Sequence, residues 1–102
     1  MSDVRTLQQR AMEISRRYDA LNKMQNGQAW DNKKLARGFK KDVEDLIEIL
    51  EVTDVDRRKL NHELGDCLWS VLVIAYKLGV DIEREFMATM EELDHRLTEE
   101  MR

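Results

Sequence analysis

Apolar residues recur at alternating spacings of three and four along most of the chain, which is the pattern of helices that bury one face. One such stripe spans residues 4–21, a second spans residues 35–50, and a last one spans residues 82–101. Each follows a residue that can cap a helix: Ser2 or Asp3, then Asp31, then Asp81. These patterns predict three amphipathic helices.

The stretch from about residue 56 to residue 78 differs, because from Leu64 onward it is apolar on nearly every face. A helix of this kind lies at the centre of a fold or at a subunit interface. Gly79 fits the left-handed position that ends a helix, and no segment alternates with period two over the length of a strand. We therefore predict an all-α fold, an antiparallel four-helix bundle with short connections, in a single domain covering residues 1–102.

Composition narrows the function classes. The chain has 21 acidic residues against 17 lysines and arginines, which argues against a basic patch that binds a nucleic-acid polymer. Cys67 is the single cysteine, so no internal disulfide forms and a reducing compartment fits. No run approaches the roughly 18 apolar residues of a membrane helix. We expect a soluble, cytoplasmic protein without a membrane partner.

Two pairs of acids lie beside the apolar stripes. Asp42 and Asp45 are three residues apart, as are Glu63 and Asp66, so each pair projects from one helix face. Two antiparallel helices joined by the short segment 51–56 would bring both pairs to one place. Four carboxylates this close raise one another's pKa, and a hard cation resolves the conflict. Mg²⁺, or Mn²⁺, prefers oxygen ligands and suits phosphoanhydride chemistry.

The two acid pairs can also be explained without a metal site. Acids make up about a fifth of the chain, so acids three apart also arise on solvated helix faces. The position of both pairs beside apolar stripes, one of them in the most apolar helix, favours the metal site. A zinc site is not expected, because His62 and His95 have no partners at zinc-ligand spacing.

The segment HELGDCLWSVLVIAYKLGVDIEREF resembles the MazG-like all-α nucleoside triphosphate pyrophosphohydrolases. Their signature is EExxE, then ExxD in a following helix, then LG(V/I)D. Residues 63–66 match ExxD fully, whereas residues 41–45 match EExxE in part, with Lys41 in place of the first acid. The resemblance covers roughly residues 4–97.

The resemblance implies Mg²⁺-dependent hydrolysis of a (deoxy)nucleoside triphosphate to the monophosphate and pyrophosphate, often as house-cleaning against non-standard nucleotides. It also implies a homodimer or homotetramer. The metal ligands and catalytic residues would be Asp42, Asp45, Glu63 and Asp66, and a water molecule on the metal would attack the phosphorus.

Three further side chains are candidates for substrate binding. Trp30 could stack on a base, as similar family tryptophans do, or anchor its loop on the bundle. Lys34 and Lys41 could meet phosphates, or Lys34 could be ordinary surface. We expect Trp69 at a subunit interface more than in a base pocket.

Departures from the family pattern support a rival function. Lys41 removes one acid, the aspartates at 42 and 45 are shorter than glutamates, and Thr89-Met90 stands where many members carry a Lys-Asn pair. The rival is a catalytically inactive helical dimerisation or nucleotide-sensing regulatory module.

Overall fold

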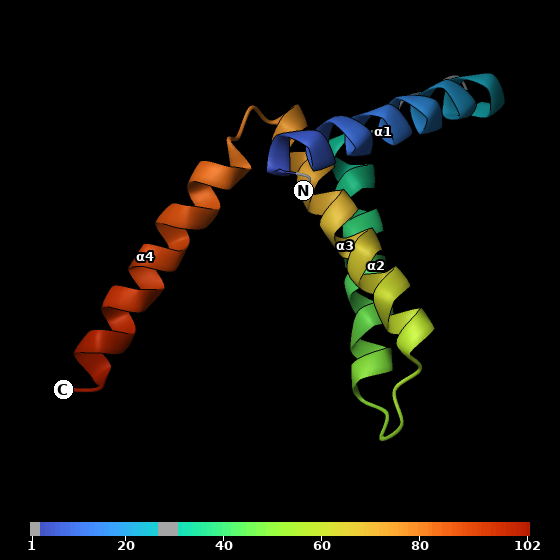
Figure 1. Ribbon diagram of the computed structural model, residues 1–102. Helices are drawn as coiled ribbons and strands as arrows, with labels where there is room; N and C mark the ends of the chain where they lie inside the picture. Colours follow the sequence, from blue (N-terminus) through green and yellow to red (C-terminus); the bar gives the residue numbers. More distant parts are fainter. Residues whose placement is uncertain (1–2, 27–30) are drawn as a thin grey trace.

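The computed structural model describes residues 3–26 and 31–102, which form helices and connecting turns with no strand among them. The described helices are α1 (Val4–Asn26), α2 (Asn32–Leu50), α3 (Arg57–Lys77) and α4 (Ile82–Glu100). The predicted all-α fold is confirmed (Figure 1). None of these described helices combines the length and apolar character that crossing a membrane requires.

The helix starts lie where the sequence places them, because aspartates satisfy backbone N–H groups that have no partner in the helix. Asp31 accepts a hydrogen bond from the Lys34 N–H at 2.9 Å, and Asp81 accepts one from the Arg84 N–H at 3.2 Å. Asp3 caps α1 in the same way. Short aspartate side chains therefore cap α1, α2 and α4 at the predicted boundaries.

Gly79 ends α3 with φ at +70°, the left-handed conformation that glycine adopts without steric cost. The N–H of Gly79 donates to the carbonyl of Tyr76, and the N–H of Val80 donates to that of Ala75. Together these bonds form a Schellman motif, which redirects the chain from α3 toward α4.

We expect Asp56→Ala to destabilise the protein by about 1 kcal/mol. The Asp56 carboxylate accepts hydrogen bonds from the N–H groups of Arg58 at 3.0 Å and Lys59 at 3.3 Å, so alanine leaves both donors to water. Urea unfolding followed by circular dichroism measures the change. Asp56→Asn, which keeps the accepting oxygen, should unfold near the wild-type midpoint; equal losses in both variants would contradict the capping role.

The buried core lies where α1 crosses the α2–α3 pair. In Figure 1, α2 and α3 run antiparallel side by side, and α1 lies across their upper end. Val73 is fully buried, and the other buried apolar residues of this core are Ala11, Met12, Leu35 and Leu72. Helix α3 packs against both α1 and α2, as expected for a central helix, while Leu64, Leu68 and Tyr76 on it remain exposed.

Polar contacts fix α1 on α3. The Trp69 indole N–H donates to the carbonyl oxygen of Ala11 at 3.1 Å, and the Gln8 amide donates to the carbonyl oxygen of Leu72 at 3.2 Å. Trp69 also packs against the core cluster. The Trp69 side chain thus makes contacts within one chain, whereas from the sequence we expected it at a subunit interface.

Helix α4 extends away from the other three helices (Figure 1). Its predicted stripe forms, yet large apolar side chains remain exposed along it: Phe86, Met87, Met90, Leu93 and Leu97. Ile82 alone among the described stripe residues of α4 packs against the core. The four predicted helices are all present, and the packing within one chain involves mainly three of them.

Candidate metal and nucleotide site

The two acid pairs face one another across α2 and α3. Asp42 and Asp45 lie on α2, Glu63 and Asp66 lie on α3, and all four residues are partly buried. The two helices are packed side by side and joined by residues 51–56. The two helices therefore lie side by side as expected, and Asp42 of α2 and Asp66 of α3 line a common pocket.

Cys67 lies close enough to acids of both helices for their charges to affect its thiol. Burial of the thiol raises its pKa, and four nearby carboxylates raise it further: those of Asp42, Glu63, Asp66 and Asp45. Each negative charge opposes the formation of a thiolate beside it. Residues from two helices thus act together on one sulfur atom, which stays protonated at neutral pH.

Three of the acids have partners of different kinds. The Ser70 hydroxyl donates to Asp42 Oδ2 at 2.9 Å, Lys41 Nζ lies 3.5 Å from Asp45 Oδ2, and His62 Nε2 lies 3.2 Å from Asp66 Oδ2. Ser70 is buried, whereas the side chains of Lys41 and His62 are exposed. Water therefore competes with the last two contacts far more than with the first.

Glu63 differs from the other three acids. Its Oε2 atom is buried and has no hydrogen-bond partner within residues 3–26 and 31–102. A buried carboxylate oxygen without a partner is costly unless a cation or donor compensates it. His62, Glu63 and Asp66 each offer one ligand atom within 4.8 Å of the others. The two carboxylates of this group are ligands that Mg²⁺ and Mn²⁺ prefer, and the imidazole of His62 suits a transition metal. Asp42 and Asp45 do not belong to this close group.

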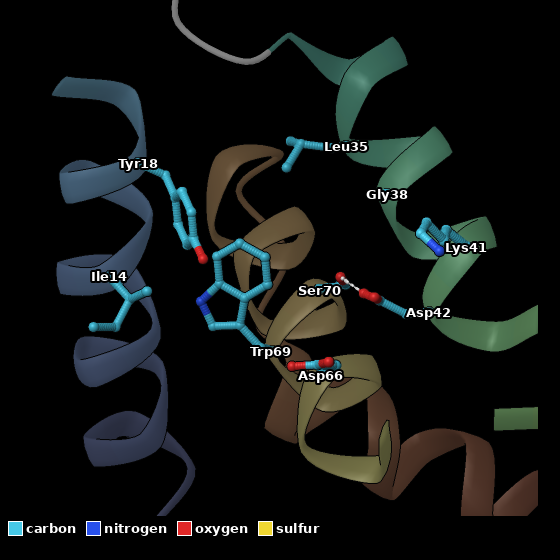
Figure 2. A pocket seen from close by; sticks show the side chains of 9 residues that line it. All are labelled: Ile14, Tyr18, Leu35, Gly38, Lys41, Asp42, Asp66, Trp69 and Ser70. Atoms are coloured by element: carbon cyan, nitrogen blue, oxygen red, sulfur yellow. Dashed lines mark hydrogen bonds between the residues drawn. The ribbon is translucent and has the colours of Figure 1, made fainter. Parts of the chain in front are cut away.

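A pocket of about 490 Å³ opens beside the acids, between α1, α2 and α3. Figure 2 shows Trp69 at its centre, Tyr18 and Ile14 on the α1 side, and the Ser70–Asp42 hydrogen bond on the other. The Tyr18 and Trp69 ring centroids are 5.9 Å apart, with their planes tilted by 58°. The pocket therefore has aromatic and aliphatic walls at one side and carboxylates at the other, and its size suits a small organic ligand.

Residues 31–100 match the family model of the MazG nucleotide pyrophosphohydrolase domain. The chain belongs to this family. The match includes both acid pairs and helices α2, α3 and α4, so the resemblance carried by ELGD and LGVD is confirmed. No curated protein and no solved structure gives a significant match to this MazG chain.

The remaining predicted site residues of the MazG domain lie at different places. Lys41 lines the pocket, whereas Lys34 lies in the first turn of α2 and is not among the lining residues. Trp30 lies outside the described residues. Thr89 and Met90 are exposed on α4, and no described residue of α4 lines the pocket.

Sequence reasoning missed several residues of this MazG site. Tyr18 looked like a member of a packing stripe, and apolar periodicity does not tell a pocket wall from a core face. Trp69 was expected at a subunit interface more than in a base pocket, whereas it lines the pocket. Ser70 was visible only as a neighbour of Asp66. The spacing of Ser70 could have indicated its place. It follows Asp66 by four residues and Glu63 by seven, so it lies on the same helix face as both acids.

Proposed function

We propose that this MazG domain hydrolyses a (deoxy)nucleoside triphosphate to the monophosphate and pyrophosphate, in a house-cleaning role. Mg²⁺, or Mn²⁺, would be held by Asp42, Asp45, Glu63 and Asp66. One observation carries the proposal: among the described residues the buried Oε2 atom of Glu63 has no hydrogen-bond partner, and Glu63 forms a group with Asp66 and His62 whose ligand atoms lie within 4.8 Å of one another. Family membership narrows this chemistry to nucleotides.

Residues on one side of the pocket would bind the cation, and residues on the other side would bind the nucleoside. The carboxylates hold the cation, which when bound neutralises phosphate charge and lowers the pKa of a water molecule. The nucleoside would occupy the pocket, with the Tyr18 and Trp69 rings offering faces and edges to a base. Lys41 is exposed at the pocket rim, so its ammonium group can leave Asp45 and meet a phosphate. Lys34 and Trp30 are also proposed to bind substrate.

Pyrophosphate release tests the activity. The protein is incubated with canonical and modified ribo- and deoxyribonucleoside triphosphates, with Mg²⁺, with Mn²⁺, and with a chelator. We expect release with metal and none with chelator, and the preferred triphosphate names the substrate. Folded protein that binds metal or nucleotide and releases no pyrophosphate would instead establish the regulatory module.

We also propose that residues 1–102 form one domain that assembles as a homodimer or homotetramer in the cytoplasm. An isolated helix in water is marginally stable, and most helices depend on burying an apolar face. Helix α4 leaves that face exposed within one chain, and a second copy of the chain would cover it. The packing of α1 on α3 supports a domain that includes the residues before the family match.

Leu93→Glu should shift the assembly toward monomers. Leu93 belongs to the exposed α4 stripe, so a charge there would be buried without a partner in the dimer. Sedimentation velocity at micromolar concentration measures the change. Ala88→Glu, which places the same charge on the opposite face of α4, serves as the control. A wild-type protein that is monomeric in this experiment would refute the oligomer.

A further inference from the structure

Ser70 links the two helices that carry the acids. It lies on α3, and its hydroxyl donates to Asp42 Oδ2 on α2 at 2.9 Å (Figure 2). Only 4% of the residue is exposed. The two residues are 28 positions apart in sequence, so this bond is a tertiary contact at the edge of the proposed metal site.

The environment of Asp42 explains why such a donor matters. Asp42 and Asp66 line the same pocket, and the repulsion between two negative charges favours an Asp42 side chain that turns away from Asp66. A hydrogen bond to the ionised carboxylate opposes that rotation. Because Ser70 follows Asp66 by one helical turn, its hydroxyl holds Asp42 on the face where the α3 acids project.

The contacts of the other acids do not provide the same constraint. Lys41 and His62 reach Asp45 and Asp66 from within the same helix, and both are exposed. Neither contact fixes α2 relative to α3. The Ser70 bond is buried and crosses between helices, so it orients one ligand with respect to the others. It also occupies one oxygen of Asp42 and leaves Oδ1 available.

We propose that Ser70 is a positioning residue, which holds Asp42 ready to bind the divalent cation. This inference rests on the metal site of the proposed function. Outer residues that hydrogen-bond to a metal ligand typically contribute about 10–100-fold in metal affinity. The hydroxyl does not touch the substrate in this role, and its effect acts through the Asp42 carboxylate.

The test measures Mn²⁺ affinity without nucleotide, by electron paramagnetic resonance titration of the full chain. We expect Ser70→Ala to weaken Mn²⁺ binding about 10–100-fold and Ser70→Thr, which keeps the hydroxyl, to restore most of it. Asp42→Asn should cause little further loss in the Ser70→Ala background, because that carboxylate is already misplaced. Ser15→Ala is the matched control: Ser15 is 5% exposed and lies on α1, so it should leave Mn²⁺ affinity unchanged.

The outcomes separate this inference from the proposed function. If wild type binds Mn²⁺ and Ser70→Ala binds it equally well, the positioning role is overturned while the metal site stands. If Ser15→Ala weakens Mn²⁺ binding as much as Ser70→Ala, the effect belongs to general core packing and the inference fails. If wild type binds no Mn²⁺, the metal site and the role of Ser70 fail together. Circular dichroism confirms that each variant is folded.

Discussion

Glu63→Gln should abolish metal-dependent pyrophosphate release and stabilise the metal-free protein. Loss of a metal ligand should cost more than the roughly 10–100-fold affinity that an outer residue contributes. The buried Glu63 Oε2 atom has no hydrogen-bond partner in the described part of the chain, and Glu63 and Asp66 offer carboxylate oxygens within 4.8 Å of each other. Removing its charge should raise the free energy of unfolding by up to about 1 kcal/mol without metal.

Two measurements on one sample check this prediction: pyrophosphate release with Mg²⁺ and urea unfolding with a chelator. Glu48→Gln is the matched control, because Glu48 is exposed on α2 outside the pocket. It should change neither quantity. Normal turnover by Glu63→Gln would remove Glu63 from the metal site. Lost turnover with lowered stability would show damage to the fold instead.

Val73→Asp should prevent the chain from folding. Val73 is fully buried in the core, and an unpaired charge there costs several kcal/mol. That cost is comparable to the whole stability of a small domain, about 5–15 kcal/mol. Val73→Ala, which removes only methyl groups, should cost about 2 kcal/mol and leave a folded protein. Far-UV circular dichroism and urea unfolding measure both effects.

Val52→Asp provides the control for the aspartate substitution. Val52 is exposed after the end of α2, so the same charge there stays hydrated and should change stability by less than about 0.5 kcal/mol. A cooperative unfolding transition retained by Val73→Asp would mean that the core described around α3 is not the one that stabilises the chain.

Helix positions were predictable because their signals are local. An aspartate before an apolar stripe caps a helix wherever that helix packs. Glycine takes the left-handed conformation at little steric cost, and Gly79 has it at the end of α3. Asp31, Asp56 and Asp81 accordingly cap the helices that the sequence predicts. The apolar pattern of α3 likewise predicted burial, and its contacts with α1 and α2 bury part of it, whereas Leu64, Leu68 and Tyr76 remain exposed within one chain.

The candidate site was predictable in part. Spacing of three put each acid pair on one helix face, and the short α2–α3 connection allowed only an antiparallel neighbour. These two facts explain why acids of both helices lie near enough to Cys67 to raise its pKa. The hydrogen-bond partner of Asp42 could not be predicted from the sequence. Ser70 and Asp42 are 28 residues apart, and their contact depends on the register of two packed helices.

The sequence by itself determined the helices, their ends, the family and the residues that carry the charge. The helices and their ends depend on interactions within one or two helical turns, so the order of residues along the chain encodes them. Only the tertiary structure decided that α4 extends away from the other helices, that Trp69 packs on α1, and that Ser70 holds Asp42. Such features arise from the relative placement of helices, and many placements satisfy the same apolar stripes.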